Sequence, residues 1–206
     1  SSDVCSSDLF CKPQQAIEYI GKITNGDAVV TTDVGQHQMW AAQFYPFKHH
    51  SQWATSGGLG TMGFGIPSAI GAQLAAPDKT VVCFVGDGGF QMTNQEMAIF
   101  NEYKLNIKVV LINNGTLGMV KQWQDKFFNH RFSHSVFNDQ PDFMKIAEAY
   151  GIKGYLIDNP AQLEQQLDKA FSSEGPALIE IRISPVEPVN PMIPAGKANH
   201  EMEGLE

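Results

Sequence analysis

Two apolar segments, each followed directly by polar residues, constrain the fold of this chain more than any other feature. The apolar run 81–85 ends in Gly-Asp-Gly-Gly at 86–89, and a helical segment then leads to the apolar run 109–112, which ends in paired asparagines. Strand, crossover helix and strand in this order are typical of a parallel sheet, whose strands all end at one edge. We therefore expect Asp87 and Asn114 to lie close together at that edge.

These two side chains are candidate ligands of a metal ion. The carboxylate of Asp87 and the amide oxygen of Asn114 are hard oxygen donors, which Mg²⁺ prefers. The glycines beside Asp87 let backbone N–H groups come close to a phosphate. The sequence thus indicates a diphosphate held through magnesium. Simple turns are the alternative, because Asp-Gly after a strand and Asn-Gly at 114–115 are both common turn sequences.

The composition is that of an ordinary globular protein. With 206 residues, 43% of them hydrophobic and 17% charged, the chain can form one domain with a substantial core. Its net charge of −8 argues against a general nucleic-acid role, and no apolar stretch is long enough to cross a membrane. The cysteines Cys5, Cys11 and Cys83 do not form an even disulfide framework, so we expect a reducing, cytoplasmic location.

Strand-like and helix-like segments alternate along the chain. Strands are expected at 28–32, 80–85, 107–112, 155–157 and 177–183. Helices are expected between Pro13 and Asn25, at 38–44, 66–76, 93–103, 141–150 and 161–171, and after a loop that begins at 115. Thr93 and Glu96 have the spacing of a capping box at the start of the 93–103 helix. This pattern predicts an α/β fold with a doubly wound, mostly parallel sheet flanked by helices.

Three segments are expected along the chain. Residues 1–10 contain repeated Ser-Ser-Asp units that fit no element of the fold, and we interpret them as a non-native or disordered leader. A flexible native terminus is the alternative. Residues 11–184 form the predicted domain, and 185–206 form a proline-rich tail that the prolines at 185, 188, 191 and 194 keep extended.

The motif at 86–89, followed by Asn-Asn at this separation, resembles the thiamin diphosphate-binding motif. Three further segments are similar to the acetolactate synthase (acetohydroxyacid synthase) family, in its large catalytic subunit. They are Thr-Thr-Asp-Val-Gly-Gln-His-Gln-Met-Trp at 31–40, Ser-Gly-Gly-Leu-Gly-Thr-Met-Gly at 56–63 and Gly-Met-Val-Lys-Gln-Trp-Gln at 118–124. The resemblance runs from about Cys11 onward and corresponds to the third, cofactor-binding domain of that subunit. The first and central domains are expected to be absent.

The resemblance implies a set of cofactor-binding residues. They are Gln36, His37, Gly60, Met62, Gly86, Asp87, Gly88, Gly89, Asn114, Thr116, Leu117, Gly118 and Met119. Asp87, Asn114 and the backbone carbonyl of Thr116 correspond to the magnesium ligands. Gln36 and His37 correspond to residues that reach the diphosphate, and Met62 to the residue beneath the aminopyrimidine ring. A helix-capping role is the alternative for His37.

Substrate residues follow from the same resemblance. Met119, Val120 and Trp123 correspond to residues near the substrates, and Trp123 to the tryptophan that favours 2-ketobutyrate over pyruvate as the second substrate. The alternative for Trp123 is a core position on an amphipathic helix. The tail segment 191–196 resembles one that folds over the entrance of the active site.

The reaction implied is that of a transferase in branched-chain amino acid biosynthesis. Pyruvate is decarboxylated, and its hydroxyethyl unit is condensed with pyruvate or 2-ketobutyrate. The activating glutamate of this family lies in the first domain, so no catalytic residue is assignable here and the chain alone is expected to be inactive. The family's FAD is held mainly by the central domain.

The resemblance also implies partners. The full-length subunit is expected to form a homodimer or tetramer and to bind a small regulatory subunit. Two other functions stay open. One is another thiamin diphosphate-dependent decarboxylase or carboligase, such as a pyruvate oxidase or glyoxylate carboligase. The other is a non-catalytic binding module.

Overall fold

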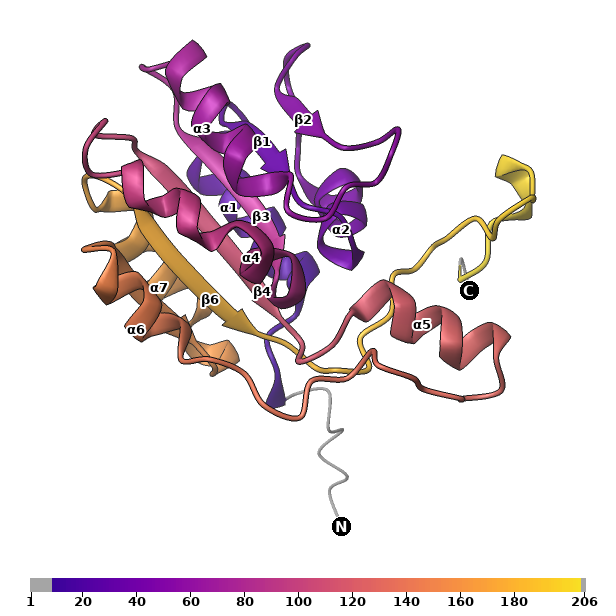
Figure 1. Cartoon of the computed structure of the whole chain (residues 1–206). Helices are drawn as coiled ribbons and strands as arrows, with labels where there is room; N and C mark the ends of the chain where they lie inside the picture. The colour runs from indigo at the N-terminus through magenta and orange to yellow at the C-terminus, as the bar shows by residue number, and fades with distance from the viewer. Residues whose placement is uncertain (1–8, 205–206) are drawn as a thin grey trace.

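Residues 9–204 are described by a computed structural model, in which a six-stranded sheet lies between two layers of helices (Figure 1). The strands are β1 (Val29–Thr32), β2 (Trp53–Thr55), β3 (Val81–Gly86), β4 (Ile107–Asn113), β5 (Lys153–Ile157) and β6 (Ala177–Arg182). Their order is β2-β1-β3-β4-β6-β5, and every neighbouring pair is parallel. The expected doubly wound α/β fold is confirmed.

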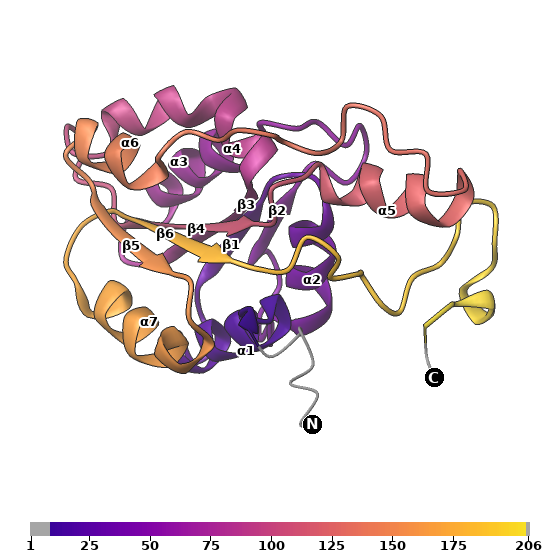
Figure 2. The ribbon, with the colours of Figure 1, turned by 90° about the horizontal axis from the view of Figure 1, so that it is seen from below.

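Helices cover both faces of this sheet, as Figure 2 shows. On one face lie α1 (Pro13–Ile23), α2 (Gln36–Phe44) and α7 (Leu163–Ser172), the last preceded by the 3₁₀ turn η3 (Pro160–Gln162). On the other lie α3 (Gly65–Ala75), α4 (Asp87–Thr93), the 3₁₀ helix η2 (Asn94–Ile99) and α6 (Phe143–Ala149). The helix α5 (Gly118–Phe127) and the tail, with η4 (Asn199–Glu201), extend beyond the carboxyl edge of the sheet.

The central strands β3 and β4 are buried along their whole length. Val82, Phe84 and Val110 belong to the core cluster beneath α1, α2 and α7, whereas Val81 and Val109 belong to the cluster beneath α3, α4 and α6. A strand covered on both faces needs apolar residues at every position, not at alternate ones. This is why both strands appear in the sequence as unbroken apolar runs.

The expected helix at 93–103 is wrong. The chain turns into α4 directly after β3, and η2 then continues from Asn94. No capping box forms, because the Thr93 hydroxyl donates to the carbonyl of Gly63, 3.0 Å away, in the loop before α3. A tertiary contact therefore replaces the local cap. The short strand β2 was not expected, since its three half-buried residues carry no periodic pattern.

The N-terminal end of the described chain lies at the carboxyl edge of the sheet, whereas the C-terminal tail extends away from it (Figures 1 and 2). Cys11 forms a bridge beside Ile183, just after β6. Of the expected leader, residues 1–8 lie outside the described range, while Leu9 and Phe10 are exposed. The tail is extended apart from η4, with Met192 bridged to Glu203. Within residues 9–204, no helix combines the length and the apolarity needed to cross a bilayer.

The strand order creates a switch point between β1 and β3. From β1 the chain first adds β2 on one side and later adds β3 on the other. Sheets of this kind bind ligands in the crevice at the carboxyl ends of the strands beside such a point. The segments that follow β1, β3 and β4 all begin at this edge, and they carry the predicted site.

Candidate functional site

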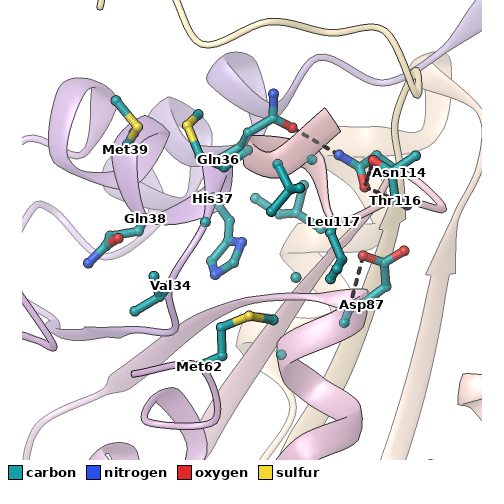
Figure 3. Close-up of a pocket in the computed structure, with 18 of the residues that line it drawn as sticks. Val34, Gln36, His37, Gln38, Met39, Met62, Asp87, Asn114, Thr116 and Leu117 are labelled. Carbon is teal, nitrogen blue, oxygen red and sulfur yellow. Dashed lines mark hydrogen bonds between the residues drawn. The ribbon is translucent and has the colours of Figure 1, made fainter. Parts of the chain in front are cut away.

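A cavity of about 250 Å³ lies at the carboxyl ends of β1, β3 and β4 (Figure 3). The structure brings together there all the predicted cofactor-binding residues and Val120. These are Gln36, His37, Gly60, Met62, Gly86, Asp87, Gly88, Gly89, Asn114, Thr116, Leu117, Gly118, Met119 and Val120. Val34, Gly35, Gln38, Met39, Trp40 and Ile112 also line the cavity and were not singled out from the sequence.

Asp87 is the first residue of α4 and is almost completely buried. Its Oδ2 accepts a hydrogen bond of 2.6 Å from Gln140 Nε2, and its Oδ1 accepts one of 3.1 Å from the backbone N–H of Gly88. Burial raises the pKa of Asp87 to about 6, and these hydrogen bonds oppose the rise. The side chain is therefore mostly an anion at pH 7, and each oxygen keeps a lone pair for a cation.

Gln140 was missed by the sequence reasoning. It comes from the irregular segment before α6, far along the chain from Asp87, and no spacing rule links the two positions. Its hydrogen bond holds one oxygen of the Asp87 carboxylate in place.

Asn114 follows β4 and lies at the same end of the cavity as Asp87 (Figure 3). Its Oδ1 accepts from the backbone N–H and the hydroxyl of Thr116, at 3.1 and 3.0 Å. Gly115 has a φ of +68°, so the Asn-Gly turn exists and presents the side chain of Asn114 to the cavity. The two candidate ligands thus lie on one side of the protein, as the strand pattern predicts.

The backbone carbonyl of Thr116 is the third candidate ligand. Thr116 forms an antiparallel bridge with Val136. The hydrogen bonds of this bridge are made by Gly115 and Leu117, which pair with Phe137 and Ser135 at 2.9 and 2.8 Å. Neither bond uses the carbonyl oxygen of Thr116, which leaves it free to meet a cation.

His37 lies in the first turn of α2 and is buried. Its Nε2 has no hydrogen-bond partner among the described residues, and it makes no side-chain cap on α2, so the capping alternative is wrong. Burial lowers the pKa of His37 to about 4, against the opposing effect of the Asp33 carboxylate, and the ring is neutral at pH 7. A Cβ on Gly86 would lie 2.8 Å from His37 Nδ1, which explains the glycine there.

Asp33 is a second residue that the sequence reasoning did not single out. It directly follows β1, is completely buried, and accepts from the backbone N–H groups of Val34, Gly63 and Gly65 at 2.9 to 3.1 Å. The carboxylate thereby holds residues 56–65, the glycine-rich loop, which carries Met62 into the cavity. Its place directly after a buried strand, beside the motif 86–89 in space, is the signal that would have found it.

Both polar atoms of the Gln36 side-chain amide form hydrogen bonds with other groups of the protein. Its Oε1 accepts from Asn114 Nδ2 at 3.0 Å, and its Nε2 donates to Gln122 Oε1 at 2.7 Å and to the carbonyl of Glu187 at 3.1 Å. A Cβ on Gly118 would lie 2.0 Å from Gln36 Oε1, so this arrangement requires a glycine at 118.

Trp123 does not line the cavity. It lies on α5, in which no residue is buried, and is 45% exposed, so the alternative of a core position is wrong. With Val120 and Phe128 it lines a neighbouring hollow. Val120 lines both spaces, so the hollow adjoins the predicted cofactor cavity along α5.

Comparison with protein families agrees with this geometry. Residues 33–181 match the thiamine pyrophosphate enzyme C-terminal TPP binding domain. The match covers the strands β2, β3, β4 and β5, most of β6, and every residue that lines the cavity. The chain therefore belongs to the family of thiamin diphosphate-binding domains.

Individual relatives narrow this class. The acetolactate synthase large subunit of Lactococcus lactis subsp. lactis (strain IL1403) is 59% identical over 194 residues, which are 94% of this chain and 34% of the relative. Isozyme 2 of Escherichia coli (strain K12) is 49% identical over 85% of this chain and 32% of its own length. The large subunit of Porphyra purpurea is 45% identical over 94% and 32%. The chain spans about a third of the length of these relatives.

Proposed function

We propose that this chain binds thiamin diphosphate through Mg²⁺ and is the cofactor-binding part of an acetolactate synthase large subunit. The observation that carries the metal proposal is the convergence of Asp87 and Asn114 at one end of the cavity. The described residues that line this cavity include no lysine or arginine. A bound diphosphate would therefore need a divalent cation to balance its charge, and hard oxygen donors favour magnesium.

The residues present fit such a cofactor. Asp87, Asn114 and the carbonyl of Thr116 would hold the metal, while diphosphate oxygens and water complete its shell. His37 Nε2 is buried and has no partner within residues 9–204, and a buried polar atom of this kind is costly unless a ligand satisfies it. The cavity is slightly smaller than the roughly 300–1,000 Å³ usual for small-molecule sites. This chain would accordingly enclose only part of the cofactor.

Thiamin diphosphate, when bound, supplies the carbanion-stabilising chemistry by which 2-oxoacids are decarboxylated. The described residues would bind and orient it. Met62, held by the loop that Asp33 anchors, would pack beneath a ring of the cofactor, and a thioether suits such an irregular apolar space. Met119, Val120 and Trp123 would meet the substrates, which we propose to be pyruvate and 2-ketobutyrate.

We propose that other parts of the enzyme supply the activating glutamate and most of the FAD site, and that a small regulatory subunit binds to it. We also propose a cytoplasmic location. The term "large subunit" in the relatives' names supports the proposal that the enzyme is assembled from more than one subunit. No observation on the described residues favours another carboligase or a non-catalytic module.

Titration calorimetry with thiamin diphosphate and Mg²⁺ tests the proposal. Wild type is expected to bind saturably, and Asp87→Ala to lose binding because it removes the only anionic ligand proposed. Asp78→Ala, which changes an exposed aspartate in the turn after α3, serves as the matched control and should bind like wild type. Absence of saturable binding by wild type, or equal binding by Asp87→Ala, would contradict the proposed site.

A further inference from the structure

Three side-chain amides connect the candidate metal ligand Asn114 to the tail. Asn114 Nδ2 donates to Gln36 Oε1 at 3.0 Å, and Gln36 Nε2 donates to Gln122 Oε1 at 2.7 Å. Gln122, on α5, then forms two hydrogen bonds to the backbone of Val189: it accepts from the N–H at 2.9 Å and donates to the carbonyl at 3.2 Å. We call Asn114, Gln36 and Gln122 the amide relay.

The polarity of an amide matters at a magnesium site. The two ends of an amide have nearly the same shape, but only the oxygen end binds Mg²⁺, since the NH₂ end offers donors alone. A ligand such as Asn114 is competent only while its oxygen faces the metal. Any group that fixes which end of the amide faces the cavity therefore contributes to metal affinity.

Backbone groups of the tail have a polarity that cannot invert. The N–H of Val189 can only donate, which places the oxygen of Gln122 toward it. The carbonyl of Glu187 can only accept, which places the NH₂ group of Gln36 toward it. The Gln36 oxygen then faces the NH₂ group of Asn114, and the Asn114 oxygen accepts from the N–H of Thr116. The tail backbone at one end of the amide relay and the Thr116 N–H at the other end thus favour the same orientation of the three amides.

The surroundings are built around this relay. Gln36 is 5% exposed, and a Cβ on Gly118 would lie 2.0 Å from its oxygen and 2.6 Å from Asn114 Nδ2. The tail is held beside the relay because Glu187 accepts from Lys12 at 2.8 Å and from Gln14 at 3.1 Å. Space, burial and anchoring all keep the three amides in one arrangement.

From this geometry we infer that Gln122 is a positioning residue for the magnesium site: through Gln36 it keeps the oxygen of Asn114 turned toward the metal. The inference rests on the proposed function, because it assigns the role of ligand to Asn114. Gln122 contacts neither the metal nor the substrate in this account. It acts by carrying the fixed polarity of the tail backbone to the ligand.

The test is the affinity for Mg²⁺ of the whole 206-residue chain, measured by calorimetry at saturating thiamin diphosphate. Gln122→Leu is expected to weaken Mg²⁺ binding roughly tenfold, as removal of outer-shell partners of metal ligands commonly does. Gln43→Leu is the matched control, since Gln43 also donates to a tail carbonyl, that of Pro191 at 2.8 Å, but does not contact the relay. It should change the affinity less than twofold.

A second variant, Asn114→Asp, distinguishes an effect of Gln122 on the orientation of the Asn114 amide from an effect on the position of the tail. In Asn114→Asp both oxygens can bind a cation, so there is no amide polarity left to fix. Adding Gln122→Leu to that variant should then cause no further loss of Mg²⁺ affinity. An equal loss in both backgrounds, equal effects of Gln122→Leu and Gln43→Leu, or wild-type affinity in Gln122→Leu would each overturn the inference. If wild type itself shows no Mg²⁺ binding, both the proposed function and this inference are wrong.

Unfolding has to be distinguished from loss of the relay. Circular dichroism and thermal melting of the metal-free proteins identify a variant that fails to fold. In that case Gln122→Met replaces it, because methionine has nearly the length of glutamine but offers no strong acceptor to Gln36 Nε2 or to Val189 N–H. The same loss of Mg²⁺ affinity is expected, and an unchanged affinity would overturn the inference.

Discussion

The carboxylate of Asp33 occupies the place where a side chain at Gly89 would begin: a Cβ atom on Gly89 would lie 2.2 Å from Asp33 Oδ1. Asp33 directly follows β1 and Gly89 lies in the first turn of α4, so the contact joins the two segments on either side of the switch point. The last glycine of the 86–89 motif is thus required by a buried carboxylate, in addition to any close approach of phosphate.

Replacing that glycine should destabilise the fold. Gly89→Ala forces Asp33 or α4 to move, and overpacking of this kind costs about 1–3 kcal/mol of unfolding free energy. Gly71→Ala, in α3, is the matched control because nothing lies within 4 Å of the added Cβ. It should leave stability unchanged or raise it by up to about 1 kcal/mol. Urea denaturation measures both, and equal stabilities would contradict the packing described.

Asp33 is itself expected to be essential for the order of the glycine-rich loop. Asp33→Asn retains one acceptor oxygen and places an NH₂ group against backbone N–H donors. Since hydrogen bonds to a charged group contribute about 1.5–3 kcal/mol each, we expect a loss of about 2 kcal/mol or more. Hydrogen exchange should also rise at Gly63 and Gly65. Unchanged exchange at these two amides would show that another group holds the loop.

The neutral state of His37 predicts a pH dependence of stability. Burial lowers its pKa to about 4 from 6.5, so the unfolded state binds more protons between these values. Stability contributed by this group is therefore complete above pH 6.5 and is lost as the pH falls toward 4, by about 3 kcal/mol in total. His37→Asn should lack this loss.

Denaturation of wild type and His37→Asn at a series of pH values from 7 to 4 checks the prediction. Asp87, whose pKa burial raises, titrates in both proteins and cancels in the difference between them. The stability gap between the two proteins should narrow on acidification. Parallel curves would show that the imidazole is accessible to protons in the folded state.

Because Trp123 is exposed, its proposed role in substrate preference can be tested without a large effect on stability. Because α5 buries none of its residues, Trp123→Leu should change the unfolding free energy by less than about 0.5 kcal/mol. In the proposed full-length enzyme the same change should erode the proposed preference for 2-ketobutyrate over pyruvate. Competition between the two acceptors measures this ratio. An unchanged ratio would favour a relative with another substrate.

Much of the architecture could be predicted from the sequence. The unbroken apolar runs of β3 and β4 reflect burial on both faces, and this local property of the chain identifies a parallel sheet and its carboxyl edge. The polar residues at the ends of these strands then had to meet. The motif spacing and the resemblance added the identities of the residues that line the cavity.

Other features follow only from the tertiary structure. The bond from Gln140 to Asp87 spans 53 residues, and that from Gln36 to Gln122 spans 86, so neither leaves a periodic trace in the sequence. The contact of Thr93 with Gly63 likewise cancelled a cap that local spacing favoured. Burial and periodicity act on neighbouring residues and can be recognised along the chain. The orientation of a polar side chain depends on partners from distant segments, and these become neighbours only when the sheet has brought the segments together.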